Sequence, residues 1–316
     1  MTIPDIHEDI IKTHILTKLD GQTLVSAGCV SSNLHTFCSD EKLWSKICHS
    51  NWPSTDHQIV TKAVSNFTAG HRSFFSDTFP SPTSHLTSTV TTSPTTPQII
   101  SSVDIKYDNK LIFSKVEVTN TKFSDWFETS PFLIDLLEPK EIVPCGVEVF
   151  GNDKLESIEK HVTLSWIMID PTRNRAVNVS SGKPVLVQRN WLTNDIELTF
   201  SKVILHENQH VSCNIQVTCG VNGGNGELHI SGVSFMVLDI DGKCLSGKDS
   251  MVILQGLMVV SRRISGGEEE RVRYDEFIKM RKERNVKKEK KERWLDLACV
   301  TSGVAMFMAF WSFALC

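Results

Sequence analysis

Residues 6–44 read IHEDIIKTHILTKLDGQTLVSAGCVSSNLHTFCSDEKLW, and this stretch decides how the chain begins. Its apolar residues recur at the spacing that gives a helix one apolar face, and Asp20-Gly21 and Asp40 suit the end of one helix and the start of another. With Trp52-Pro53 closing the last helix, the stretch predicts four short helices in a unit that covers residues 1–55. So small a unit buries little apolar surface by itself, and we expect it to complete its core against a partner.

A polar segment follows this unit. Residues 81–97 (SPTSHLTSTVTTSPTTP) contain eleven Ser or Thr residues and three Pro residues in seventeen positions. Such a composition cannot bury enough apolar surface to offset the entropy that is lost on ordering. We therefore expect residues 56–98 to form a linker, rich in Ser, Thr and Pro from residue 81 onward.

The middle of the chain, residues 99–265, has the pattern of β-strands. Short or alternating apolar runs are bounded by Gly, Asn, Asp and Pro, and the segments at 221–226 and 239–243 have the residues of hairpin turns. One helix is expected near 123–137. Strands are expected at 111–118, 142–150, 162–169, 184–188, 196–205, 210–219, 227–238 and 251–261. These runs predict a mainly antiparallel, β-sandwich-like domain, so that the chain as a whole has an α+β fold.

Charge and hydropathy change sharply near the end of the sequence. The chain has 33 Lys and Arg residues against 37 Asp and Glu residues, a formal net charge of −4, yet nine basic and three acidic residues fall between Lys279 and Arg293. The uncharged run from Leu297 to Cys316 follows directly. About 20 apolar residues let a helix cross a hydrocarbon core roughly 30 Å thick, and adjacent cations attract anionic headgroups. We expect a basic helical collar at 266–294 and a transmembrane tail anchor at 295–316.

Other interpretations of these two segments remain open. The apolar run could be a helix buried in a soluble domain, and the collar could be a solvated helix face or an arm that contacts nucleic acid. Because the cations adjoin the apolar run, we favour membrane lipid as the partner and expect no nucleic acid.

The compartment follows from the N-terminal sequence and from the cysteines. The first residues contain no uninterrupted apolar segment of a secretory signal, and nine Cys residues without a C-x-x-C pair fit a reducing compartment. We expect the protein on the cytosolic face of an intracellular membrane, held by a single-pass C-terminal anchor. The endoplasmic reticulum is the first choice of membrane, and an additional nuclear pool remains open.

The sequence contains no motif for catalysis. Residues 232–236 (GVSFM) lack the second Gly of a nucleophile elbow, and the Gly-rich segment lacks the Lys-Ser/Thr of a phosphate loop. The best metal-ligand candidates are His206, His210, Cys213 and Cys219, but residues 210 and 213 of one strand point to opposite faces. We therefore expect no enzyme, no metal and no cofactor.

The helical unit resembles an F-box, the motif by which one class of ubiquitin-ligase subunits binds its adaptor. The family motif opens with Leu-Pro-x-Asp, continues with a Leu- and Ile-rich helix and a Cys-x-Val-Ser type segment, and ends in Asp-x-x-Leu-Trp. The resemblance implies an adaptor-binding set made of Ile6, Asp9, Ile10, Ile15, Leu16, Leu19, Leu24, Cys29, Val30, Ser31, Leu34, Leu43 and Trp44. His7 stands where the family has Pro, and Leu34 where many members have Trp or Phe. Loss of the Pro would weaken helix initiation and with it adaptor binding.

A second resemblance lies in the β-rich domain. The run LSWIMIDPTRNRAVNVSSGKPVLVQRNWL at 164–192 is similar to the substrate-side domain of a plant F-box group that includes the cytokinin-induced F-box proteins. In that group an F-box, a strand-rich domain and a C-terminal membrane segment occur together. The motif usually ends in His-Trp-Leu, where this sequence has Asn190-Trp191-Leu192. Trp166 and Trp191 are candidates for substrate binding, and burial as core anchors is the alternative.

Together these resemblances imply a non-catalytic substrate-recognition subunit of an SCF-type (Skp–cullin–F-box) ubiquitin ligase. Its partners would be a Skp-type adaptor and through it a cullin, an unknown protein substrate, and membrane lipid. Cytokinin-related hormone signalling is the context that the resemblance suggests. The alternative is a membrane-anchored, lectin-like binding module with a degenerate F-box and no ligase role.

Overall fold

The N-terminal residues fold into short helical segments at the places that their spacing predicts. The computed structural model describes residues 7–86, 96–122, 124–148, 154–221, 226–263 and 267–315. Side-chain caps set two of the helix starts, because Asp20 accepts from the backbone N–H of Thr23 and Asp40 accepts from that of Lys42. The segments are α1 (Glu8–Ile10), the π-helix η2 (Ile11–Ile15), the 3₁₀-helix η3 (Leu16–Lys18), α2 (Gly21–Gly28), α3 (Ser32–Cys38) and α4 (Glu41–Asn51).

The region after α4 differs from the expected linker. A 3₁₀-helix, η4 (Pro53–Asp56), leads into α5 (Gln58–Val64) and α6 (Gly70–Thr78). Six buried apolar side chains of α5, α6 and the segment between them join the core of the helical unit, although the polar residues around them hide this pattern in the sequence. They are Val60, Ala63, Val64, Phe67, Phe74 and Phe75. Residues 53–78 therefore complete the core of the helical unit, whereas the sequence predicted that a partner would complete it. Of the Ser/Thr/Pro-rich segment, 87–95 lies outside the described residues.

Two β-sheets form the middle of the molecule. The four-stranded sheet has the order β4-β3-β7-β8 and is antiparallel throughout. The seven-stranded sheet has the order β2-β10-β11-β12-β5, with β6 also on β12 and β9 also on β10, and its β2–β10 pair is parallel. The strands of these sheets are β2 (His85–Leu86), β3 (Gln98–Tyr107), β4 (Lys110–Asn120), β5 (Leu133–Asp135), β6 (Val143–Glu148), β7 (Val162–Asp170), β8 (Arg175–Asn178), β9 (Leu186–Arg189), β10 (Ile196–His206), β11 (Gln209–Val221) and β12 (Glu227–Leu238). A separate two-stranded sheet pairs β1 (Ser81–Pro82) with β13 (Arg262–Arg263).

Several elements of this domain differ from the expectation. The run at 251–261 is helical, in α9 (Gly247–Val259), because Ser246 caps it and a short, wholly buried apolar run fits helix and strand equally well. The helix expected at 123–137 is confined to α7 (Asp125–Thr129) and is followed by β5. Strand β3 and helix α8 (Lys154–His161) were not expected from the sequence.

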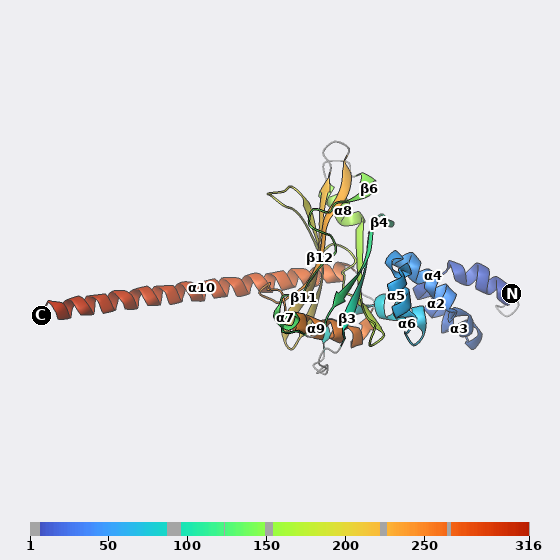
Figure 1. Ribbon diagram of the computed structural model, residues 1–316, viewed down its shortest axis with the longest axis horizontal. Helices are drawn as coiled ribbons and strands as arrows, with labels where there is room; N and C mark the ends of the chain where they lie inside the picture. The colour runs from blue at the N-terminus through green and yellow to red at the C-terminus, as the bar shows by residue number, and fades with distance from the viewer. Residues whose placement is uncertain are drawn as a thin grey trace.

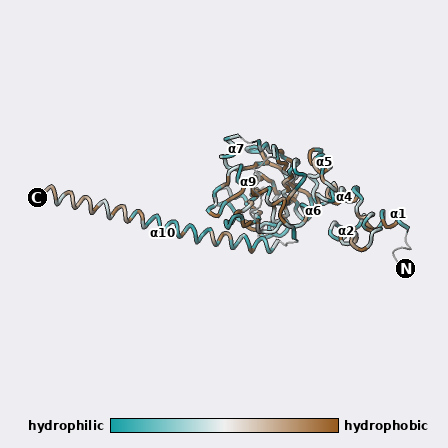
Figure 2. Tube along the Cα trace, turned by 90° about the horizontal axis from the view of Figure 1, so that it is seen from below, coloured by the Kyte–Doolittle hydropathy of each residue, from teal (hydrophilic) through white to brown (hydrophobic). Residues whose placement is uncertain are grey.

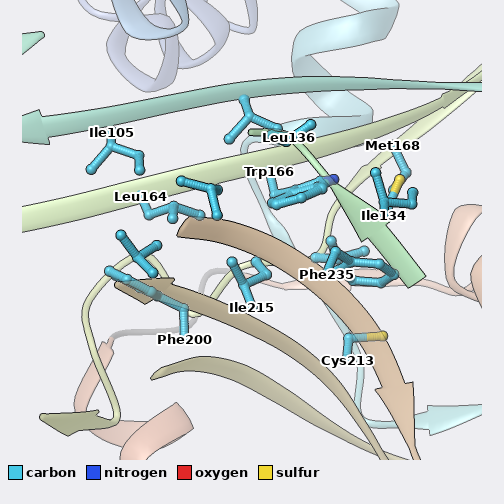
Figure 3. Packing of buried hydrophobic residues seen from close by; sticks show 14 of the residues in the cluster. Ile105, Ile134, Leu136, Leu164, Trp166, Met168, Phe200, Cys213, Ile215 and Phe235 are labelled. Atoms are coloured by element: carbon cyan, nitrogen blue, oxygen red, sulfur yellow. The ribbon is translucent and has the colours of Figure 1, made fainter. Parts of the chain in front are cut away.

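The main core lies between the two sheets (Figure 3). Trp166 of β7 is fully buried there, and its ring lies 5.4 Å from that of Phe235 of β12. Side chains of α9 join the same cluster. The predicted α+β class, with a mainly antiparallel sheet domain behind a helical front, is confirmed.

The four-stranded sheet is the middle layer. Residues of alternate parity on β3 face opposite sides, so that Val103 points into the sandwich and Ile100 packs against the helical unit. Ile167 and Ile169 of β7 also face the helical unit. Figure 1 shows this order of layers, with the helical unit on one side of the sheets and the C-terminus far out on the other.

The collar and the apolar run form one continuous helix, α10 (Gly267–Ala314). Figure 2 shows the first part of α10 as hydrophilic and the part toward the C-terminus as more hydrophobic. Within the described part of the chain, α10 is the one helix long and apolar enough to cross a membrane, and no residue of its apolar half is buried.

Candidate functional site

The predicted adaptor-binding residues separate into an exposed set and a buried set. Ile10, Ile15 and Val30 leave 49%, 41% and 70% of their surface open. Apolar side chains this exposed are uncovered by the rest of the chain, and a group of them on one small unit is typical of a protein-binding surface. We call Ile10, Ile15 and Val30 the open apolar set.

Four further apolar members of the prediction are core residues of the helical unit. Leu16, Leu24, Leu43 and Trp44 are all buried. The Trp44 Nε1–H donates to the backbone carbonyl of Cys38 over 2.7 Å, which satisfies the one polar atom of the indole. These four residues hold the surface in shape and are not available to contact an adaptor.

The π-helix explains how neighbouring isoleucines come to face opposite ways. In η2 the backbone N–H of Leu16 donates to the carbonyl of Ile11, so residues five apart stack on one face. Ile11 and Leu16 consequently both point inward, while Ile10 and Ile15 both point outward. The regular helix expected from the sequence would not divide them in this way.

The remaining predicted residues have mixed positions. Leu19 and Leu34 are half-buried against the core of the helical unit, and Asp9 and Cys29 are exposed. Ser31 is the N-cap of α3, because its hydroxyl accepts from the backbone N–H of Leu34. Ile6 lies outside the described residues.

His7, the departure from the family pattern, supplies a cap of its own. Its Nδ1 accepts from the backbone N–H of Asp9 over 3.3 Å at the start of α1. Helix initiation therefore has a side-chain cap in place of the proline of the family motif.

Helix α6, which the sequence assigns to the linker, supports the predicted site from behind. The Phe75 ring lies 5.2 Å from the Trp44 ring and 5.7 Å from the Trp52 ring. It also fills the space beside Gly21, where an added Cβ would lie 2.2 Å from the ring. The paired aromatics Phe74-Phe75 were the available signal for this helix in an otherwise polar stretch.

A mostly apolar hollow of about 630 Å³ lies between α2 and α6. Val25 and Phe79, each about two-fifths exposed, form its apolar rim, and Arg72 is at its edge. The hollow extends the exposed apolar surface of the helical unit beyond the residues of the family motif.

Buried polar contacts fasten the helical unit to the middle sheet. Asp104 of β3 accepts from the backbone N–H and the hydroxyl of Ser54, and also from the hydroxyl of Ser114 over 2.8 Å. Burial raises the pKa of Asp104, and the hydrogen bonds from Ser54 and Ser114 act against that rise. A second contact joins Asp77 of α6 to Arg175 of β8, with Nε and carboxylate oxygen 2.9 Å apart. The helical unit is thereby held in one orientation on the sandwich.

The two tryptophan candidates for substrate binding differ completely in environment. Trp166 has none of its surface exposed, and its Nε1–H donates to the Ser101 hydroxyl, so it is a core anchor and cannot contact a substrate. Trp191 is 91% exposed in the turn between β9 and β10, next to Leu192 at 75%. The side-chain oxygen of Asn190 accepts from the backbone N–H of Leu192 and of Thr193 and so orders this turn.

The candidate metal ligands do not converge. Cys213 and Cys219 point into the sandwich core, where burial raises the pKa of the Cys213 thiol to about 12. His210 lines a small hollow beside α10 instead. Over the residues that the structure describes, no group of three or more His, Cys, Asp or Glu side chains could hold a metal ion.

Comparison with known proteins identifies the helical unit and its relatives. The F-box-like family matches residues 10–50. F-box protein At2g27310 of Arabidopsis thaliana is 41% identical over 329 residues, covering 99% of this chain and 96% of its own length. Probable F-box protein At2g36090 of Arabidopsis thaliana is 40% identical, covering 99% of this chain and 93% of its own length. F-box protein At3g44326 of Arabidopsis thaliana is 38% identical, covering 98% of this chain and 89% of its own length. No solved structure matches the chain.

Proposed function

The chain belongs to the F-box protein family, and on this premise we propose that it is the substrate-recognition subunit of an SCF-type ubiquitin ligase. The helical unit binds a Skp-type adaptor, and through it a cullin. The observation that carries the proposal is the open apolar set, because Ile10, Ile15 and Val30 stay exposed on a unit whose core is already filled by its other helices. Covering such residues is the usual driving force of a helical protein interface.

In this role the chain positions the substrate for ubiquitination and does not itself catalyse the reaction. The Asp104 and Asp77 contacts keep the helical unit at one orientation to the sandwich. An adaptor on the helical unit and a substrate on the sandwich are then held at a fixed separation, which orients the substrate toward the ubiquitin-loaded enzyme on the cullin.

The substrate is a protein that the β-domain holds. Trp191 and Leu192 are our candidates for its contact, since an ordered turn presents both side chains almost fully exposed. Exposed tryptophan is a frequent anchor of protein interfaces because it buries a large area on contact.

The apolar half of α10 tethers this subunit to the cytosolic face of an intracellular membrane, with the endoplasmic reticulum as the proposed membrane. Residues 295–315 are uncharged except for Asp296 and lie exposed, which suits lipid surroundings. Confinement to one surface raises the effective concentration of membrane-bound substrates without any additional contact.

We further propose cytokinin-related signalling as the context. This rests on the run at 164–192, which spans β7, β8 and β9 and resembles the cytokinin-induced F-box group. Stability of candidate substrates in cells with and without the chain, measured before and after cytokinin treatment, tests this part separately.

The ligase role is tested by co-purification of the full-length chain with Skp-type adaptor and cullin. Ile10→Asp combined with Val30→Asp should weaken adaptor affinity at least about tenfold, since it puts charges into the apolar contact. Val286→Asp is the control, because Val286 is an apolar residue on α10 that is as exposed as Ile10, at 49%.

Adaptor binding that the double variant leaves intact would overturn the proposed contact. The lectin-like alternative predicts a different pattern, in which the unmodified chain fails to bind adaptor and binding appears only after His7→Pro and Leu34→Trp are introduced. Thermal unfolding of each variant shows whether the helical unit is still folded.

A further inference from the structure

Strand β4 lies at one edge of the four-stranded sheet, and among the described strands it pairs with β3 alone. In an antiparallel pair, residues that exchange hydrogen bonds with the neighbouring strand alternate with residues whose backbone N–H and C=O point away from it. An edge strand therefore presents a row of such groups to its surroundings. The bonds of β7 show which residues of β4 present them.

The direction of the backbone groups can be followed across the sheet from Trp166. Its carbonyl accepts from the N–H of Val179, the residue after β8, so its backbone groups point to the β8 side. Trp166 lies opposite Val103 of β3, and Val103 lies opposite Lys115 of β4. Val103 consequently bonds to β4, and Lys115 bonds back to β3. The residues of β4 that alternate with it, and whose backbone groups point outward, are Ser114, Val116 and Val118.

We call Ser114, Val116 and Val118 the open edge. Among the described residues, no hydrogen bond from another element reaches their backbone groups. The β-bulge of the β3–β4 pair lies nearer the hairpin, between Ile105 and Lys106, and β4 contains no proline. Bulges and prolines are devices that block an edge, so the open edge is a regular row that a further strand can join.

Two other sheet edges are closed by contacts within the chain. At β8, the Ala176 N–H donates to the Asp77 carboxylate and the Ala176 carbonyl accepts from Arg262, each over 3.1 Å. At β10, strands β2 and β9 cover the two ends, and between them the Ser201 N–H donates to the Ser181 hydroxyl. The chain thus satisfies the backbone of these two edges itself, in contrast to the open edge.

The side chains of β4 decide which segment fits. Val116 and Val118 are half-buried against the core of the helical unit. Lys115 and Glu117 lie on the opposite face of the strand, where the Lys115 ammonium donates to the Leu136 carbonyl. An added strand would place alternate side chains beside the valines and the others beside the charged residues. The open edge therefore fits an extended segment with an apolar residue at every second position and polar residues between them.

We propose that the open edge binds an extended segment of the substrate protein as a further strand of the four-stranded sheet. The inference rests on the proposed function and adds to it the kind of segment that is recognised. The outward groups recur about every 6.7 Å, which matches an extended chain, whereas a helix bonds its own backbone groups internally. Main-chain hydrogen bonds supply the affinity of such strand addition, and alternate side chains supply its selectivity.

A displayed library of random peptides, selected on the full-length chain in detergent micelles, supplies the probe. The enriched peptides are synthesised and their affinity is measured for Val116→Pro, which removes an outward N–H that the bonds to β3 do not use. Val116→Thr is the matched control, because it keeps this N–H and nearly the same shape. We expect binding at least about tenfold weaker to Val116→Pro, and within about twofold of the unmodified chain for Val116→Thr.

A second measurement needs no variant of the chain, so it remains decisive if thermal unfolding shows that Val116→Pro is not folded. The backbone nitrogens of an enriched peptide are methylated one at a time. Binding should weaken at every second position only, because alternate N–H groups of an added strand point toward β4. Amide exchange at Val116 and Val118 should slow at least about tenfold in the complex, since their N–H groups become bonded.

Three outcomes would overturn the inference. The first is a selection that enriches no peptide of alternating pattern, and the second is an enriched peptide whose binding ignores both Val116→Pro and the period of two. The third is a dimer, seen by sedimentation, that Val116→Pro dissociates, since the edge would then bind a second copy of the chain. Co-purification with the adaptor does not involve β4, so its loss or retention reports the ligase role independently.

Discussion

Ser54 donates two hydrogen bonds to the carboxylate of Asp104, one from its backbone N–H at 2.9 Å and one from its hydroxyl at 2.6 Å. Both residues are buried, and Ser54 directly follows the Trp52-Pro53 pair at the end of α4. The Asp104 side chain of the middle sheet thus binds the segment that directly follows the last helix of the predicted F-box.

Removing this carboxylate should loosen the helical unit from the sandwich. Asp104→Ala leaves a buried N–H and two hydroxyls without their acceptor, at an expected cost of about 1–3 kcal/mol in the free energy of unfolding. Urea denaturation measures this cost, and amide exchange should rise in residues 54–78. Asp135→Ala, at an exposed aspartate of β5, is the control and should change stability by less than about 0.5 kcal/mol. An Asp104 variant no less stable than this control would contradict the anchoring role.

The two tryptophans of the candidate substrate site should respond in opposite ways. Trp166→Ala empties part of the sandwich core and should cost about 3–5 kcal/mol in unfolding free energy. Trp191→Ala should leave stability within about 0.5 kcal/mol, because its side chain has few contacts within the chain. Substrate capture from cell extract by the folded Trp191→Ala chain, compared with the unmodified chain, measures the second effect. Undiminished capture would remove Trp191 from the site.

Local signals made the first half of the helical unit predictable, and long-range contacts made the second half unpredictable. Asp20 and Asp40 cap helices whose apolar residues repeat within a few positions, so their pattern can be read from neighbours alone. Helix α6 lies in a polar stretch, and its Phe75 is explained only by packing against Trp44 and Trp52. The division of the predicted adaptor residues likewise depends on the π-helix, which regular spacing does not reveal.

The buried charged residues of the β-domain were likewise not predictable from local sequence. Lys202 alternates with Phe200 and Ile204 on the inner face of β10, where an apolar residue would be expected. It is only 4% exposed, and its Nζ donates to the backbone carbonyl of Asn178 on the facing sheet. A contact between strands 24 positions apart cannot be inferred from local sequence.

Lys202 makes a specific prediction for the pH dependence of stability. Burial lowers its pKa from 10.5 to about 8, against the attraction of Glu270. The unfolded chain therefore binds more protons than the folded chain between these values, and this residue's contribution to stability rises as pH increases from about 8 to 10.5. At 1.36 kcal/mol per pKa unit, the whole rise is about 3 kcal/mol.

Lys202→Met should remove that rise. The unfolding free energy of the unmodified chain minus that of the variant, measured by denaturation at several pH values, should increase across this interval. Buried thiols such as Cys48 and Cys145, whose pKa values are raised by burial, act in the opposite sense, but they are common to both proteins and leave the difference unaffected. A difference that is flat with pH would mean that Lys202 is protonated equally in both states.

The Asp241 carboxylate lies 2.9 Å from the Arg284 Nε and 2.6 Å from the Lys288 Nζ, and this contact should hold that part of α10 against the β-domain. The Lys288 hydrogen bond and the Arg284 charge keep the pKa of Asp241 below its usual range, so the carboxylate is ionised at neutral pH. Asp241→Lys replaces this attraction with repulsion from Arg284 and Lys288, and should release α10 from the β-domain around these two residues. Amide exchange should then quicken at residues 281–294 and remain slow around Phe277, whose ring stays in the core. Glu138→Lys makes the same charge change at an exposed site and should leave exchange in α10 unaltered. If Asp241→Lys leaves exchange equally unaltered, packing of Phe277 is sufficient to hold α10 on the β-domain, and the Asp241 contact does not contribute.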